Sequence, residues 1–360
     1  MRRWLVWTLL VVSVALGATD AEAQFRYLCF GDSITLGNYD DDYDPDLGYP
    51  GRLAFGSRLN CFAANCEVIN KGKSGEKTPG GLTRIDNVLN NFPSHVLLLM
   101  EGTNDIFVEY DKDYPPWSFE TMVFNLKEMA RKAEDRGTDA VHASIIWFNP
   151  GGTHGTSKNG EVEDLRDAMD SAASANSRYF VDIWNVLCPT GLDVHGHTQA
   201  QCFNLHYPPA PAEDDRGHPN GSGYDMVADE FFDEITSVPV PGAPATVNPK
   251  NTISTSTPTF TWTRESPVRA TWYRLQVDDS VGTVLDTWLK AADYCGGSSC
   301  SASSIVTLAN GSHSWRVRGR NPKGTGNWSS SRSFTVSVSA AIFQDGFESG
   351  NTSAWSSSLP

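Results

Sequence analysis

The feature that most constrains the fold is an alternation of short apolar runs with amphipathic stretches across residues 25–238 of this 360-residue chain. Apolar runs too short for helices are typical of strands that are buried on both faces. The clearest amphipathic stretch, 119–136, places Phe119, Met122 and Leu126 on one helical face. The alternation predicts a parallel sheet with helices on both sides. The predicted strands are 25–30, 67–70, 96–101, 140–147 and 179–183, and the predicted helices are 119–136, 163–176 and 222–238.

The composition changes abruptly after residue 238. Residues 239–246 are Pro-rich and predict a semi-rigid linker. Beyond them apolar residues alternate with polar ones, as in Phe260-Thr-Trp262, which predicts a small all-β sandwich domain. Residues 247–338 resemble a fibronectin type III or related immunoglobulin-like module. For the remaining tail, 339–360, both a sorting role and a disordered end stay open.

The N-terminus has the pattern of an export signal. Arg2 and Arg3 precede the apolar run 4–16, and Ala21-Glu22-Ala23 supplies a cleavage site of small residues. The apolar run is shorter than the ~20 residues that span a bilayer. We therefore expect a signal peptide at residues 1–23, bacterial export to an extracellular location, and no membrane insertion.

Cysteine spacing agrees with an oxidising compartment. Three local disulfides are plausible, although the sequence cannot establish connectivity. The expected pairs are Cys61 with Cys66, Cys188 with Cys202, and Cys295 with Cys300. Cys29 is left over inside an apolar run, where we expect a small buried thiol.

The charge balance limits the kinds of ligand that the protein is expected to bind. With 43 acidic and 28 basic residues the net charge is -15, which disfavours nucleic acid and anionic lipid as ligands. The acidic loop 40–46 lacks the spacing of a calcium-binding EF-hand, and we expect a solvated loop there. The histidines of the insertion 184–214 do not match a zinc site. Because the insertion ends just before Asp215, we expect it to shape substrate access.

Polar motifs follow the first three predicted strands, where a parallel sheet binds its ligands. Ser33, in Gly31-Asp32-Ser33, follows the first strand, and a helix starting there would place its positive end beside the serine. Gly75 follows the second strand and can present a backbone N–H without an obstructing Cβ. Asn104 follows the third strand, and its side-chain amide can donate to an oxyanion.

A fourth motif precedes the last predicted helix. An Asp three residues ahead of a His can fix its tautomer, as Asp215 can for His218. Asp214 stands four residues ahead, and we prefer Asp215 for its spacing. Each motif taken alone is explained equally well by a turn or a helix cap. Their combination in this order predicts an active site.

Together the motifs resemble the signature blocks of the SGNH (GDSL-type) hydrolase family, over roughly residues 25–238. The resemblance implies a catalytic domain at 24–238 with a three-layer, flavodoxin-like α/β fold and a five-stranded parallel sheet. It implies Ser33 as nucleophile, His218 as base and Asp215 as orienting carboxylate. The oxyanion hole would combine the N–H groups of Ser33 and Gly75 with the amide of Asn104. Such chemistry requires no metal and no organic cofactor, and the Gly-x-Ser-x-Gly pentad of the α/β-hydrolases is absent from the sequence.

These features predict a secreted serine carboxylic-ester hydrolase that works through an acyl-enzyme intermediate. Its substrate is expected to be an acetylated carbohydrate or another short-chain acyl ester, and a lipase or lysophospholipase is the alternative. A non-enzymatic alternative is a polysaccharide-binding or adhesion protein. In that case aromatic residues of the second domain would stack on sugars, although aromatics that alternate in strands are more often core residues. The residues concerned are Trp262, Trp272, Trp288, Trp315 and Trp328. The sequence does not indicate the oligomeric state.

Overall fold

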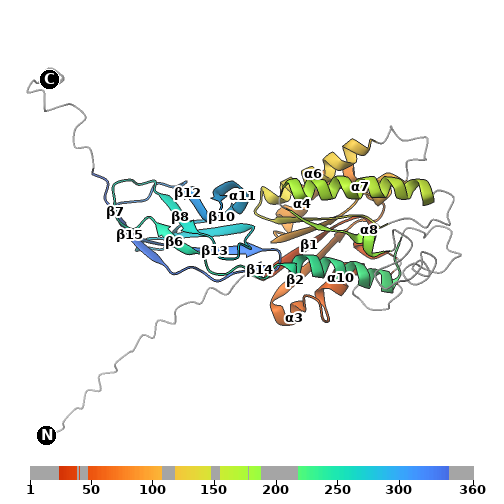
Figure 1. Cartoon of the computed structure of the whole chain (residues 1–360), viewed down its shortest axis with the longest axis horizontal. Helices are drawn as coiled ribbons and strands as arrows, with labels where there is room; N and C mark the ends of the chain where they lie inside the picture. Colours follow the sequence, from red (N-terminus) through yellow and green to blue (C-terminus); the bar gives the residue numbers. More distant parts are fainter. Residues whose placement is uncertain are drawn as a thin grey trace, which may run out of the picture.

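A computed structural model describes the chain at residues 24–38, 40, 48–107, 118–146, 155–176, 178–187 and 218–339, with only the backbone at 107 and 155–159. The first part of the chain, up to residue 237, is an α/β domain (Figure 1). Its elements are β1 (Phe25–Gly31), α1 (Ser33–Leu36), α2 (Gly48–Ala54), α3 (Cys61–Ala64), β2 (Cys66–Gly72), α4 (Thr78–Asn91), β3 (Val96–Met100), α5 (Thr103–Phe107), α6 (Phe119–Glu134), β4 (Asp139–Ala143), α7 (Gly155–Ala175), β5 (Tyr179–Val181), α8 (Ile183–Val186) and α10 (Gly221–Ser237).

The predicted parallel sheet is confirmed. Its strand order is β2-β1-β3-β4-β5, and every neighbouring pair is parallel. Gly31, the last residue of β1, pairs with Gly72 of β2 and with Met100 of β3. The carboxyl ends of these three strands are therefore level with one another.

Helices cover both faces of this sheet and give the predicted three layers. Helices α2 and α10 pack on one face, and α4, α6 and α7 pack on the other (Figure 1). Strand β3, Val-Leu-Leu-Leu-Met, is buried along its whole length because it has a helical layer on each side. In α10 the buried Tyr224, Phe231 and Ile235 share one face, and Phe231 stacks on Tyr49 at a centroid distance of 4.8 Å.

Some element boundaries differ from those predicted. Strand β4 ends at Ala143 because its neighbour β5 ends at the paired Val181, so the apolar run to 147 has no further strand partner. Helix α7 begins at Gly155, ahead of the predicted residue 163, because its first turns contain no apolar pattern that reveals a helix. Helix α4, not delimited from the sequence, buries Ile85, Val88 and Leu89.

The second part of the chain is all-β apart from one helical turn, as predicted. Two sheets, with strand orders β10-β9-β13-β15-β7 and β11-β12-β8-β6, enclose a common core, and β14 pairs with β13. The elements are β6 (Ala245–Asn248), β7 (Asn251–Ile253), β8 (Thr259–Thr263), β9 (Trp272–Asp278), β10 (Thr283–Lys290), α11 (Ala291–Tyr294), β11 (Cys295–Gly296), β12 (Ser299–Ser303), β13 (Gly311–Asn321), β14 (Gly324–Thr325) and β15 (Arg332–Val336). Trp262 and Trp315 are fully buried in this core. Trp272 is buried outside this core, and Trp288 and Trp328 are partly exposed.

The cysteine predictions are confirmed where the structure describes them. Cys61 is bonded to Cys66 and Cys295 to Cys300, and Cys29 is a buried free thiol in β1. The proposed Cys188–Cys202 pair lies outside the described residues, as do the predicted signal peptide 1–23 and tail residues 340–360. Within the described parts of the chain, no helix has the length and apolarity that crossing a membrane requires.

The sandwich contacts the amino-terminal edge of the parallel sheet, and the two domains lie end to end (Figure 1). The indole Nε1 of Trp272 donates to the carboxylate of Asp139, the first residue of β4, at 3.0 Å. Arg320 donates to the carbonyl of Gly137, and its Nε lies 3.6 Å from Asp139 Oδ2. Lys290 pairs with Glu134 at 2.9 Å. The carboxyl ends of β1, β2 and β3 therefore face away from the second domain.

Candidate active site

Ser33 lies at the carboxyl end of β1 and is the first residue of α1. The preceding Asp32 caps this helix, because its carboxylate accepts a hydrogen bond from the N–H of Ile34 at 2.9 Å. Gly31 allows β1 to approach β3 closely, since a Cβ at this position would lie 1.8 Å from the carbonyl oxygen of Met100. The serine is thus held at a tight turn from strand to helix, with 5% of its surface exposed.

His218 meets Ser33 directly, although 185 residues separate them in the sequence. Its Nε2 lies 2.7 Å from Ser33 Oγ. When the serine hydroxyl donates in this hydrogen bond, the imidazole proton must be on Nδ1. An imidazole in this position can accept the hydroxyl proton as the oxygen attacks a carbonyl carbon.

Helix α10 fixes His218 against the serine turn. The Asn220 side chain caps α10 by accepting from the N–H of Gly223 at 2.9 Å. One turn into the helix, the Tyr224 hydroxyl donates to the carbonyl of Asn38 at 2.7 Å, and the N–H of Asn38 donates to the carbonyl of Ser33 at 3.0 Å. The segments that carry Ser33 and His218 are consequently joined by the hydrogen bond from Tyr224 to Asn38 as well as by the contact between the two side chains.

The predicted orienting carboxylate lies outside the described residues. Asp215, the alternative Asp214, and His195, His197 and His206 of the insertion all belong to this part of the chain. Asp215 therefore stays a prediction that rests on its spacing from His218 and on the family resemblance.

Of the two predicted oxyanion donors outside the serine turn, Gly75 belongs to the loop after β2 and Asn104 to helix α5, and these two segments bond to each other. Gly75 has a φ of +72° and is exposed, and a Cβ placed on it would have no heavy atom within 4 Å. The Asn104 amide Nδ2 donates to the carbonyl of Glu76 at 2.9 Å, so it is tied to the residue after Gly75. The Gly75 loop also bonds to the strand that leads into the serine turn, because Lys73 N donates to the Gly31 carbonyl at 3.0 Å.

A partly buried ion pair between Glu76 and Arg84, which the sequence did not reveal, holds the Gly75 loop. The Glu76 carboxylate accepts from Arg84 Nε at 3.1 and 2.8 Å and from Arg84 Nη2, and Lys73 Nζ reaches it at 3.1 Å. Arg84 also donates to the carbonyl of Lys71 at 3.0 Å, and its guanidinium lies 3.9 Å from the ring centre of Phe30. Glu76 and Arg84 belong to different elements, and no helical or strand periodicity relates them, so only the fold brings them together.

Buried carboxyl groups surround the serine turn. Burial raises the pKa of Asp32 to about 6, against the opposing hydrogen bond from Ile34. Burial also raises the pKa of Glu101 well above its usual range, and repulsion from Glu76 and Asp32 adds to this effect. Asp105 has a raised pKa for the same main reason, although the Thr78 hydroxyl and N–H donate to it at 2.7 and 2.9 Å. Asp32 and Asp105 thus hold the turn and the loops in place.

No metal-binding group of three or more His, Cys, Asp or Glu residues exists among the residues that the structure describes. Asp40, the described residue of the acidic loop, instead bonds to Arg52 at 2.7 Å and to the N–H of Gly48 at 2.9 Å.

Comparison with known proteins places the first domain in a family. The profile of the GDSL-like Lipase/Acylhydrolase family matches residues 29–226, which is more than half of the chain. No curated protein matches the chain.

Several solved structures are similar to the α/β domain at low sequence identity. An acetylxylan esterase from Geobacillus stearothermophilus, solved as a catalytic mutant, is 18% identical with a TM-score of 0.47, over 59% of this chain and 95% of that one. A member of the lipolytic G-D-S-L family from Veillonella parvula is 20% identical with a TM-score of 0.43, over 57% and 95% of the two chains. A GDSL-like lipase from Bacteroides thetaiotaomicron is 19% identical with a TM-score of 0.42, over 58% and 86%. Likeness at this level does not define a substrate. The family profile, the parallel sheet and the ordered motifs agree, and the chain belongs to the GDSL-like lipase/acylhydrolase family of hydrolases.

Proposed function

We propose that this protein is a secreted serine carboxylic-ester hydrolase, with Ser33 as its nucleophile and His218 as its general base. The observation that carries the proposal is the 2.7 Å contact between His218 Nε2 and Ser33 Oγ, at the carboxyl edge of the sheet. A serine hydroxyl is a weak nucleophile on its own, and an adjacent imidazole activates it by accepting its proton.

In the proposed reaction, Ser33 Oγ attacks the ester carbonyl carbon as its proton passes to His218. The N–H groups of Ser33 and Gly75 and the Asn104 amide donate to the oxyanion that forms. The protonated His218 then returns the proton to the leaving alcohol, which leaves an acyl group on Ser33. Water, activated by the same imidazole, releases the carboxylic acid. Asp215 is proposed to hold the imidazole in the tautomer that these steps require.

We propose an acetylated carbohydrate or another short-chain acyl ester as the substrate. Neutral polar side chains border the nucleophile: Asn38, which bonds to the serine turn, donates from Nδ2 to the exposed Ser74 Oγ at 3.0 Å. Such a rim favours an alcohol rich in hydroxyl groups over a long acyl chain, because polar groups covered by an apolar chain would lose their hydrogen bonds to water.

Two further features support the extracellular part of the proposal. Disulfides such as Cys61–Cys66 form and persist in oxidising compartments. We propose that the sandwich is a module of the fibronectin type III kind, and such modules commonly accompany enzymes that act on extracellular polymers.

The test compares wild-type protein and Ser33→Ala on acetylated xylan, on a short p-nitrophenyl ester and on a long-acyl ester. The proposal expects hydrolysis of the first two by wild-type protein and a loss of at least about 1000-fold in kcat for Ser33→Ala. Faster hydrolysis of the long-acyl ester would indicate a lipolytic enzyme instead. Unchanged activity in Ser33→Ala would refute the mechanism.

A further inference from the structure

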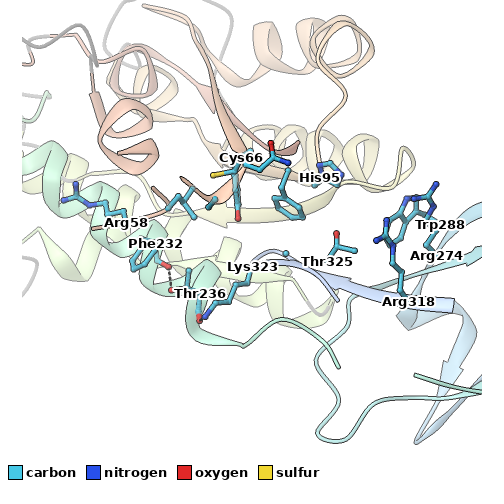
Figure 2. Close-up of a pocket in the computed structure, with 16 residues that line it drawn as sticks. Arg58, Cys66, His95, Phe232, Thr236, Arg274, Trp288, Arg318, Lys323 and Thr325 are labelled. Carbon is cyan, nitrogen blue, oxygen red and sulfur yellow. Dashed lines mark hydrogen bonds between the residues drawn. The ribbon is translucent and has the colours of Figure 1, made fainter. Parts of the chain in front are cut away.

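A cleft of about 640 Å³ lies between the two domains (Figure 2). Phe25 at the start of β1 lines it, whereas Ser33 follows the other end of this strand. On the α/β side its wall includes Phe25 and Cys66, the first residues of β1 and β2, and His95, just before β3. On the sandwich side it includes Arg318 of β13 and Thr325 of β14. The cleft is therefore built by both domains and exists only when they are joined.

The lining of this cleft is cationic in a chain whose net charge is -15. Among its 16 lining residues, all within the described part of the chain, none is acidic and four are cations: Arg58, Arg274, Arg318 and Lys323. Arg58 also pairs with Asp225 at 2.9 Å and with Asp229 at 2.6 Å, and Arg274 pairs with Asp286 at 2.6 Å; all three carboxylates lie outside the lining. A cleft lined by one sign of charge concentrates counter-ions, in this case anions.

The positive charges near the cleft also affect the protonation of His95. Burial, and then the positive charges of Arg320, Arg26 and Arg318, lower the pKa of His95 to about 4. His95 Nδ1 accepts the N–H of Arg26 at 3.1 Å, so the neutral ring carries its proton on Nε2. His95 therefore contributes a neutral N–H donor to the cleft lining and carries no charge of its own.

The cations stand at separate places along the cleft rather than in one cluster. Figure 2 shows Arg58 at one end, Arg274 and Arg318 beside Trp288 at the other, and Lys323 between them. A small monoanion can meet only one of these positions. A chain that carries a carboxylate on successive units can meet several at once.

Aromatic rings supply flat apolar surfaces between these charges. Phe25 stacks on His95 with a centroid distance of 4.5 Å, and Phe232 and Trp288 also face the cleft. Trp288 is partly exposed, with the Arg320 guanidinium 4.4 Å from its ring centre. The apolar faces of such rings suit the C–H faces of pyranose sugars, and the indole N–H of Trp288 can also donate a hydrogen bond.

We propose that this cleft binds an acidic polysaccharide chain of the polyuronate type, with carboxylates on the cations and sugar rings on the aromatics. The site is separate from the catalytic serine: β1 runs from Phe25 to Gly31, a span of roughly 20 Å at ~3.3 Å per residue. The cleft thus holds a polymer while the opposite edge of the sheet carries out hydrolysis. This inference does not depend on which ester Ser33 attacks.

Calorimetric titration of the full chain with an unacetylated oligogalacturonate tests the proposal, with a neutral xylo-oligosaccharide of equal length as the comparison ligand. Two variants place a carboxylate in the lining without removing a core residue: Lys323→Glu, at an exposed position, and Thr325→Glu. Lys250→Glu, exposed on the sandwich but outside the cleft, is the matched control.

We expect the acidic oligosaccharide to bind and the neutral one not to. Each cleft variant should weaken binding by at least about 10-fold, and added salt should weaken it as well. Hydrolysis of a small p-nitrophenyl ester should stay the same in both variants and in the presence of the oligosaccharide. Absence of binding, equal binding by Lys323→Glu and Lys250→Glu, or equal affinity for single-stranded DNA of matched charge would overturn the proposal.

Discussion

At the scale of single residues, the chemistry depends on side chains that the fold holds in place before any substrate arrives. Ser33 and His218 are in contact, and the Asn104 amide is already oriented by the carbonyl of Glu76. A donor fixed in advance stabilises a developing oxyanion without reorganising during the reaction. The hydrogen bond from Asn104 to Glu76 therefore joins two segments before substrate binds, and we propose that it also orients the Asn104 amide for catalysis.

Asn104→Ala tests this role. Loss of one oxyanion donor is expected to lower kcat on a short p-nitrophenyl ester by about 100- to 1000-fold, with little change in KM. Asn87→Ala, at an exposed position of α4, is the control and should keep wild-type kinetics. A rise in KM with unchanged kcat would instead assign Asn104 to ground-state binding.

At the scale of elements, the Glu76–Arg84 pair links the loop after β2 to α4, and Arg84 Nη2 also donates to the carbonyl of Gly31, at the end of β1, at 3.4 Å. The buried Glu76 carboxylate and the partly exposed Arg84 guanidinium share several hydrogen bonds, and such a pair defines one loop geometry. Because the loop carries Gly75, and its Glu76 carbonyl orients Asn104, we expect the pair to act as a positioning device.

Arg84→Lys keeps the charge and removes the planar fork that bonds to Glu76. We expect kcat to fall by about 10-fold with a smaller change in KM, because the donors become misplaced while the nucleophile is kept. Arg131→Lys, in an exposed pair with Glu128, is the control and should change neither parameter. If Arg84→Lys lowers stability and leaves kcat unaltered, the pair is structural only.

The cap of α1 predicts a pH dependence of stability. The pKa of Asp32 is raised to about 6 by burial, so its protonated form is favoured in the folded state. The resulting contribution of Asp32 to stability is fully present below the pKa of this residue in the unfolded chain, near 4. It is lost as the pH rises through about 6.

Urea unfolding of wild-type protein and Asp32→Asn between pH 4 and 8 measures the effect. The advantage of wild type over the variant should shrink as the pH rises, by about 1–3 kcal/mol. For Asp86→Asn, the advantage of wild type should instead shrink as the pH falls. The hydrogen bond from Lys132 lowers the pKa of Asp86, so the contribution of Asp86 to stability is lost at low pH. Parallel curves for Asp32→Asn and wild type would contradict the assignment.

How much of the fold the sequence predicts depends on how local the signal is. Buried runs such as β3 and the capped α10 carry their own periodicity, and the sequence identifies them. The ends of β4 and α7 depend on partners: β4 ends where β5 ends, and α7 begins in polar turns. Ser33, Gly75, Asn104 and His218 were predicted because each belongs to a short motif. Arg84 was not predicted, because only the tertiary fold brings it to its partner Glu76.

At the scale of the whole molecule, hydrolysis and domain attachment are at opposite edges of one sheet. The sandwich contacts the amino-terminal edge through Trp272, Arg320 and Lys290, while Ser33 follows the carboxyl end of β1. A domain placed there does not cover the serine. Its contacts are expected to affect stability and not the chemical step.

Trp272→Phe separates these two properties. The variant removes the indole donor and leaves the buried Asp139 carboxylate without that hydrogen bond, at a cost of about 1–3 kcal/mol. Urea unfolding should report this loss, and kcat on a small ester should stay at the wild-type value. Tyr294→Phe, at an exposed position, is the control. Lower kcat at unchanged stability would contradict the separation of the two edges.

The central claim is that Ser33 is the activated nucleophile, and covalent labelling tests it most directly. A fluorophosphonate probe reacts with a serine whose hydroxyl is activated by a neighbouring base. After labelling of the full chain, digestion and mass spectrometry should place the probe on the peptide that contains Ser33, and His218→Ala should abolish the reaction. A probe on another serine, or equal labelling of Ser33→Ala, would contradict the claim.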